Sequence, residues 1–260
     1  LKGEKIMKKF LTVALAGVLA ASMLFTGCSK KAESKVPDKL IVGTNAEFPP
    51  FEYMNDKKQP EGFDIAMIKE IGKRMGKKVE IKNMEFKSLI GAMESDSINA
   101  IIAGMTKTEK REKAVDFSDS YYTTNQAIIL KKDSKITKLA QLDGKKIGVQ
   151  EGTTGDLISS GDKFGDGKKA KVLVKGAKVK RFKKGVDAVM DLKNGSVDAV
   201  VIDELTANEF VKKNAKKLKI VIDSAGSEYY CIALTKGNTA YKEEVNKQIK
   251  AIKEDGTYDK

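Results

Sequence analysis

The sequence predicts an α/β protein with two lobes, each built on a mainly parallel sheet flanked by helices. From Lys39 onwards, short β-branched runs alternate with segments of helical periodicity, a pattern typical of parallel strands covered by helices. Residues 93–102 and 192–201 follow the same helix-turn-strand plan, which indicates a βαβ unit present twice. A chain of 260 residues is long enough for two modest domains.

We expect residues 39–130 and 225–260 to form the first lobe. Apolar residues recur at helical spacing before Gly76, and a glycine at that place marks the end of a helix. The β-branched runs around this helix indicate buried strands. The predicted elements are strand 40–44, helix 65–75, a strand from Val79, helix 89–93, strands 100–103 and 126–130, and a closing helix at 245–252.

Residues 131–224 are expected to form the second lobe. The polar turn 131–134 is the predicted first crossing between the lobes, and residues 220–234 are the predicted return. Because ligands collect at the carboxyl ends of parallel strands, the residues that follow such strands are candidates for a shared cleft. The predicted elements are strand 146–150, helix 154–158, strand 172–174, helix 186–192, strand 199–202 and helix 205–211.

The N-terminal segment has the features of an export signal. Two lysines follow Met7, residues 10–25 are almost wholly apolar, and small Gly27 precedes Cys28. The apolar run is shorter than the roughly 20 residues of a membrane-spanning helix. We therefore predict a cleaved signal peptide rather than a membrane span.

The end of this segment resembles a bacterial lipobox, with Phe25 where Leu, Val or Ile is more common. We predict a signal peptide at 1–27, of which 1–6 lie upstream of the true start. Acyl chains such as palmitate on Cys28 would anchor the protein to a lipid bilayer, and polar residues 28–38 would be a flexible tether. The alternative is an ordinary secretory signal with an incidental cysteine.

Composition excludes several kinds of chemistry. The sequence has no histidine, which removes Ser-His-Asp triads and histidine-rich zinc sites, so neither a metal nor a cofactor is expected. Cys231 lies in an apolar stretch, so we expect a buried thiol and no intrachain disulfide. The net charge of +13 comes mostly from lysines without interleaved aromatic residues, which argues against nucleic-acid binding and favours an anionic membrane surface.

A polar turn after strand 100–103 predicts a carboxylate site. Gly104 lets a ligand approach the backbone, and Thr106 with Glu109 fits a capping box, whose free N–H groups attract an anion. Arg111 lies within two turns of that helix start, and its guanidinium can hold a carboxylate through two parallel hydrogen bonds. The alternative is that Arg111 is one charge on a Lys/Glu-rich surface helix.

In the second lobe, Asp203 ends the apolar strand 199–202. A buried carboxylate needs a partner, which an α-ammonium group would supply. The alternative is that Asp203 caps the helix that begins at Glu204. A carboxylate-binding group in one lobe and an ammonium-binding group in the other together describe a site for a zwitterion.

Aromatic and polar residues complete the predicted cleft. Phe48 lies in a loop with two prolines, Phe86 precedes helix 89–93, and their two rings could enclose an aliphatic side chain. The alternative is that both are core residues. Gln150 and Thr154 belong to a glycine-bearing strand-to-helix turn, for which an N-cap is the ordinary explanation.

On the basis of these residues and the segments around them, the chain from 39 to 258 resembles the polar amino-acid family of solute-binding proteins that serve ABC importers. The matches occur in order along the chain. They are residues 42–44 through 50–52, 62–64, 104–106 with Glu109 and Arg111, 116–119 with 121–122, 148–150 with 152–154, 198–199 with Asp203, and 255–258.

The resemblance implies a type II periplasmic-binding-protein clamshell with two hinge strands and a site for a free L-amino acid. The residues implied to hold the ligand α-carboxylate are Gly104 through its backbone, Thr106, Arg111 and Thr154. Asp203 is implied to hold the α-ammonium group. The residues implied around the ligand side chain are Phe48 and Phe86 at its flanks and Asn45 and Gln150 near its tip.

The side-chain end of the site offers amides and has no obvious second arginine, so an acidic ligand would leave a carboxylate unpaired. We expect arginine or lysine, with glutamine, histidine and cystine as alternatives. The resemblance implies a non-catalytic monomeric receptor, lipid-anchored on the outer face of the cytoplasmic membrane, that docks onto an ABC permease. Two rival classes are a dehydratase-like enzyme, for which Glu47 and Glu85 could serve as acid and base, and a sensor domain.

Overall fold

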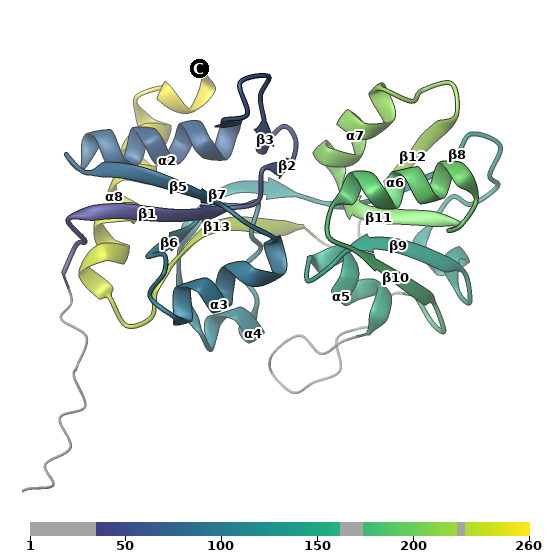
Figure 1. The fold of residues 1–260 in the computed structure, drawn as a ribbon, viewed down its shortest axis with the longest axis horizontal. Helices are drawn as coiled ribbons and strands as arrows, with labels where there is room; N and C mark the ends of the chain where they lie inside the picture. The colour runs from purple at the N-terminus through teal and green to yellow at the C-terminus, as the bar shows by residue number, and fades with distance from the viewer. Residues whose placement is uncertain (1–34, 162–173, 223–226) are drawn as a thin grey trace, which may run out of the picture. The chain divides into compact units, whose positions relative to one another are not determined.

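A computed structural model describes residues 35–161, 174–222 and 227–260, and these belong to one compact unit. Their strands form two five-stranded sheets and one three-stranded sheet (Figure 1). Helices pack on both faces of each large sheet, so the α/β class and the two lobes predicted from the sequence are confirmed. The predicted signal peptide, Cys28 and most of the predicted tether lie outside the described residues.

The first sheet has the strand order β5-β1-β6-β13-β7. Strands β5 and β6 pair in parallel with β1, whereas β13 is antiparallel to β6 and to β7. The strands are β1 (Lys39–Thr44), β5 (Lys78–Asn83), β6 (Ala100–Ile101), β7 (Val115–Thr124) and β13 (Glu228–Thr235). The helices are α2 (Phe63–Arg74), η1 (Phe86–Ser88), α3 (Leu89–Glu94), α4 (Glu109–Glu112), α8 (Thr239–Glu254) and η3 (Thr257–Asp259).

The second sheet has the strand order β10-β9-β11-β8-β12. Strands β10 and β11 pair in parallel with β9, whereas β8 is antiparallel to β11 and to β12. The strands are β8 (Gln126–Lys131), β9 (Lys146–Gln150), β10 (Lys178–Phe182), β11 (Ala199–Asp203) and β12 (Leu218–Ile222). The helices are η2 (Leu139–Leu142), α5 (Thr154–Ser160), α6 (Gly185–Asn194) and α7 (Glu204–Lys212).

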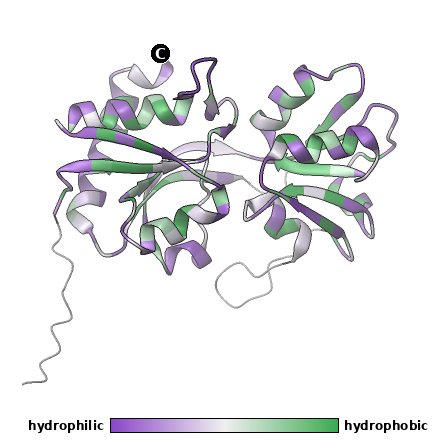
Figure 2. Ribbon diagram, viewed as in Figure 1, coloured by the Kyte–Doolittle hydropathy of each residue, from purple (hydrophilic) through white to green (hydrophobic). Residues whose placement is uncertain are grey.

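Burial explains why these segments form strands. Every residue of β11 is buried, as expected for a central strand that helices cover on both faces. Helices α2 and α8 pack on one face of the first sheet and α3 on the other; in the second lobe α6 and α7 oppose α5. Figure 2 shows hydrophobic residues along the central strands and hydrophilic residues on the outer faces of the helices.

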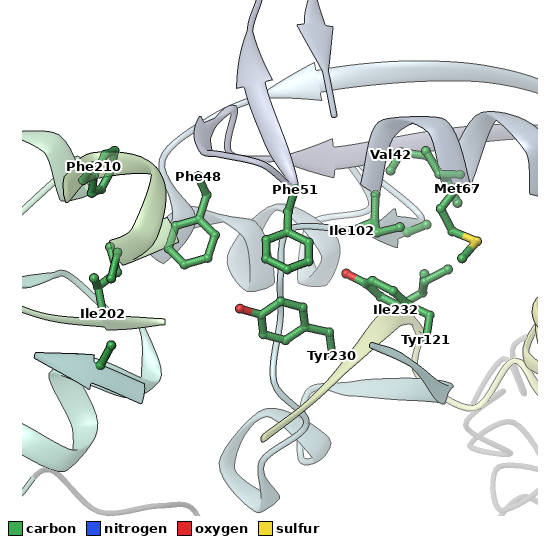
Figure 3. Close-up of a cluster of buried hydrophobic side chains, with 14 of the residues drawn as sticks. Val42, Phe48, Phe51, Met67, Ile102, Tyr121, Ile202, Phe210, Tyr230 and Ile232 are labelled. Carbon is green, nitrogen blue, oxygen red and sulfur yellow. The ribbon is translucent and has the colours of Figure 1, made fainter. Parts of the chain in front are cut away.

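One buried cluster joins the two lobes. It includes Phe48, Phe51 and Tyr230 with the first sheet and Ile202 and Phe210 with the second. The rings of Phe51 and Tyr230 meet edge to face with centroids 5.0 Å apart, and Figure 3 shows Phe48 between these rings and Ile202. The small sheet of β2 (Glu47–Phe48), β3 (Glu52–Met54) and β4 (Pro60–Glu61) carries Phe48 into this cluster.

The predicted boundary between the lobes is wrong for one strand. Residues 126–130 were expected in the first lobe, before a crossing at 131–134, but β8 pairs only with β11 and β12 among the described strands. The chain therefore crosses near Asn125, between β7 and β8. An apolar strand buried on both faces fits either sheet, so periodicity could not identify its partner. The boundary expected at 225 lies outside the described residues.

Two other segments differ from expectation. The predicted strand 172–174 lies largely outside the described residues. The edge strand β10 was not predicted, because three of its five residues are charged and its side chains are mostly exposed. The predicted tether is shorter than expected. Asn238 Nδ2 donates to Lys35 O at 2.8 Å, and Val36 packs against the core of the first lobe.

Gly62 provides a test of the turn that leads into α2. Its φ is +121°, and a Cβ there would lie 2.4 Å from Phe51 O, which itself accepts a hydrogen bond from Asp64 N. We expect Gly62→Ala to lower the free energy of unfolding by about 2–4 kcal/mol in urea titrations. The matched control is Gly91→Ala in α3, where a Cβ meets nothing within 4 Å. It should be neutral or stabilising by up to about 1 kcal/mol, and equal effects of the two substitutions would contradict this account.

Candidate functional site

A small cavity lies between residues of the two lobes. The wall combines aromatic rings, hydroxyls, an amide and one charge of each sign. The lining residues are Asn45, Phe48, Phe86, Ala103, Gly104, Arg111, Thr153, Thr154 and Asp203.

Arg111 comes from α4 and is 8% exposed. Its guanidinium donates to Thr106 O at 2.5 Å and to Gly152 O, in the other lobe, at 3.0 Å. It also lies over the ring of Phe86, 5.3 Å from the centroid. Loss of hydration lowers the pKa of Arg111 to about 10, so the group stays protonated at neutral pH. Since a guanidinium has five N–H donors, donors remain for a ligand.

Asp203 ends β11 and is 4% exposed. Its carboxylate accepts hydrogen bonds from Gln126 Nε2 and from the hydroxyl of Tyr230. Although the residue stands at the N-cap position of α7, its side chain makes no capping hydrogen bond, so the capping alternative is wrong. Burial, followed by repulsion from Glu228, raises the pKa of Asp203 to about 8. The carboxylate would therefore be stabilised by a cation in the cavity.

The backbone at Gly104 is held in place from the core. Its N–H donates to Asp64 Oδ2 at 2.8 Å, and the Tyr121 hydroxyl donates to the same oxygen at 2.7 Å. With φ at +51°, a Cβ on Gly104 would lie 3.2 Å from the ring of Tyr230 and 3.4 Å from that of Phe48. Glycine thus fits here for both conformation and space.

Thr154 and Gln150 belong to the turn between β9 and α5. Thr153 is the N-cap of α5, since its Oγ1 accepts from Asp156 N at 3.4 Å, which leaves Thr154 at the cavity wall. Gln150 does not line the cavity. Its Nε2 donates to Asn45 Oδ1, in the first lobe, at 2.8 Å.

Seven of the nine predicted site residues line the cavity, whereas Thr106 and Gln150 do not. The predicted capping role of Thr106 is wrong, because Thr108 is the N-cap of α4 and accepts from Arg111 N at 3.3 Å. Thr106 Oγ1 instead donates to Glu228 Oε2 at 2.8 Å. The residues that line the cavity as predicted are Asn45, Phe48, Phe86, Gly104, Arg111, Thr154 and Asp203.

Glu228 is the important residue that sequence reasoning missed. It begins β13, and its carboxylate interacts with the side chains of Thr106, Thr154 and Gln126. Desolvation raises its pKa, and Asp203 and Glu228 repel each other. One charged residue at the start of a strand has no distinctive pattern in a chain this rich in charge.

The two other acidic residues considered for the cleft are held by lysines. Lys184 Nζ lies 2.6 Å from Glu47 Oε1, and Lys183 Nζ lies 2.6 Å from Glu85 Oε1. Together with the pair Lys87–Glu151 (2.7 Å), these contacts connect the lobes at partly exposed positions. A carboxylate engaged by an ammonium in this way is a poor general acid.

Within the described ranges, no cluster of three or more His, Cys, Asp or Glu residues could hold a metal ion. The same part of the chain contains no helix that is both long and apolar enough to cross a bilayer.

The protein has two large sheets, a cavity lined by residues of both lobes, and a pair of opposite charges in the wall of that cavity. These features define a protein that binds a solute. Residues 40–260 match the family model for bacterial extracellular solute-binding proteins, family 3. The chain belongs to this family.

Individual relatives agree with that assignment. The arginine-binding extracellular protein ArtP of Bacillus subtilis strain 168 is 33% identical over 98% of this chain and 96% of its own length. An ancestral arginine-binding protein, solved with bound arginine, is 44% identical with a TM-score of 0.78, over 86% of this chain and 96% of that chain. The arginine-, lysine-, histidine-binding protein ArtJ of Geobacillus stearothermophilus is 37% identical with a TM-score of 0.74, over 85% and 91%.

These relatives are transport receptors, so the predictions of a solute-binding protein and of no enzymatic activity are confirmed. The type II periplasmic-binding-protein fold implied by the resemblance is confirmed as well.

The buried carboxyl of Asp203 predicts how stability depends on pH in the ligand-free protein. Its pKa is raised from 3.8 to about 8, so between these values the native state binds more protons than the unfolded state. The free energy of unfolding should therefore fall as pH rises through this window, by up to about 1.4 kcal/mol per pH unit for this group.

Asp203→Asn should make that slope shallower and should leave the variant more stable than the wild type at pH 8 in urea titrations. Asp64, whose pKa burial raises to about 6, contributes a slope of the same sign that the variant keeps. Parallel stability curves for the two proteins would show that Asp203 titrates normally.

Proposed function

We propose that this chain is the extracytoplasmic substrate-binding lipoprotein of an amino-acid ABC importer and that it binds a free polar L-amino acid. The observation that carries the proposal is the presence of Arg111 and Asp203, from separate lobes, in the wall of one cavity. A buried pair of opposite charges suits a small dipolar solute better than an apolar one.

The α-carboxylate would be bound by Arg111. Its remaining N–H groups provide charge-assisted hydrogen bonds, which are the strong kind. The hydroxyl of Thr154, the backbone at Gly104 and the nearby Thr106 are assigned to the same group. Because the Gly104 N–H donates to Asp64 in this structure, it would have to change partner to bind the carboxylate.

The α-ammonium would be bound by Asp203. Gln126 and Tyr230 each donate to this carboxylate, which holds it in one orientation and leaves lone pairs for the ligand. An arriving ammonium would offset the lost hydration and shift the carboxyl towards its ionised form.

The ligand side chain would lie between Phe48 and Phe86 and would reach Asn45, with Gln150 behind it. The amide oxygen of Asn45 accepts from Gln150, and such oxygens suit a guanidinium or an ammonium. We favour arginine or lysine, which agrees with the ligands after which ArtP and ArtJ are named. Glutamine, histidine and cystine are the alternatives.

Attachment to the outer face of the bacterial cytoplasmic membrane would come from acyl chains on Cys28. A monomer held there could deliver its closed, liganded form to the transmembrane subunits of a permease. The family description as extracellular supports a location outside the cytoplasm.

A thermal-shift screen of the twenty amino acids and cystine tests the ligand assignment. Arginine or lysine should give the largest rise in Tm, because at equal concentration the ligand with the lowest Kd stabilises the native state most. A ligand at 100 times its Kd stabilises that state by about 2.7 kcal/mol. Arg111→Ala should abolish the rise for every ligand. The matched control is Arg74→Ala, an arginine that pairs with Glu70 and Asp255 on the surface of the first lobe. It should keep the full ligand response, and a response retained by Arg111→Ala would refute the carboxylate assignment.

Lipid anchoring is tested by fractionation of bacterial cells that express the full chain. The wild type should sediment with membranes, and Cys28→Ser should be released. Cys231→Ser is the matched control because that thiol is buried in β13, 3% exposed, and should leave the membrane association unchanged. Membrane association that survives Cys28→Ser would exclude this anchor.

A further inference from the structure

Glu228 is half-buried and does not line the binding cavity itself, but its carboxylate lies near residues that do. Its Oε2 accepts from Thr106 Oγ1 at 2.8 Å, and its carboxylate also interacts with the side chain of Thr154, a residue of the cavity wall. Thr106 belongs to the first lobe and Thr154 to the second, so this one carboxylate contacts polar groups of both.

The charges around the cavity do not balance when all are ionised. Arg111 contributes one positive charge, and Asp203 and Glu228 contribute two negative charges. A zwitterion with a neutral side chain adds no net charge and leaves one negative charge uncompensated. A cationic amino acid adds one positive charge and brings the sum to zero. In an enclosed site an uncompensated charge is costly, and the usual outcome is that a carboxylate takes up a proton.

We propose that Glu228 is a specificity-determining residue that selects amino acids with a net positive charge: it stays ionised beside a cationic ligand and must be protonated beside a neutral one. This inference rests on the function proposed above and adds a physical reason why the site would prefer a cationic amino acid to a neutral one. Asn45 and Gln150 contribute hydrogen bonds to a cationic side chain but no charge to balance it.

Among the residues that the structure describes, the titratable and charged groups that interact with Glu228 are Arg111 from α4, Asp203 from β11 and Tyr230 from β13 itself. Its strand partner on β7 is Thr124, which does not titrate in this range. Loss of hydration raises the pKa of the Glu228 carboxyl, while its hydrogen bonds and Arg111 oppose that shift.

The test compares arginine with glutamine, which carry identical α-groups, so that the titration of Asp203 contributes similarly to both. Calorimetry in buffers of different ionisation enthalpy counts the protons taken up on binding. Glutamine should take up about one proton more than arginine, and its affinity relative to arginine should fall as pH rises from 6 to 8. Glu228→Gln keeps an oxygen that can accept from Thr106 but removes the charge. It should equalise the proton counts and reduce the preference for arginine about tenfold or more.

The matched control is Glu112→Gln, which removes a carboxylate that pairs with Lys107 on the exposed surface beside Arg111 and should change neither quantity. Equal proton counts for the two ligands in the wild type would overturn the proposal without any variant. An unchanged preference in a folded Glu228→Gln protein would also overturn it. If neither ligand binds the wild type, the proposed function fails instead, so the two failures are distinguishable.

Discussion

The burial of opposite charges in one small cavity is the constraint on which the other features of this site depend. Arg111 and Asp203 are 8% and 4% exposed, and neutral groups hold both: two backbone carbonyls for the guanidinium, an amide and a phenol for the carboxylate. Loss of hydration lowers the pKa of Arg111 and raises the pKa of Asp203, so it favours the uncharged form of each group. The empty site is thus electrostatically unfavourable, and a dipolar solute relieves that cost when it enters.

Strand β13 connects this site to the core of the protein. Tyr230 packs its ring against Phe51 with centroids 5.0 Å apart and donates its hydroxyl to Asp203. Glu228, two residues earlier on the same strand, contacts Thr106 and a residue at the start of α5. Because the ring is fixed by packing rather than by the ligand, the Asp203 carboxylate keeps its orientation in the absence of solute.

The sequence predicted those parts of the site that depend on local pattern. Arg111 and Asp203 could be found because each follows a buried β-branched strand, and the carboxyl ends of such strands converge. Glu228 could not be found, since its position beside Thr106 results from a contact 122 residues apart in the chain. The sheet membership of β8 was likewise undetermined, because a strand buried on both faces carries no mark of its neighbour.

The three lysine–glutamate pairs between the lobes differ from the buried contacts between the lobes in their exposure to solvent. Their side chains are between 25% and 71% exposed, whereas the hydrogen bond from Gln150 to Asn45 is buried. Dissolved electrolyte weakens exposed pairs and leaves buried contacts nearly untouched. At high ionic strength the contacts at the rim would therefore weaken while those in the interior hold.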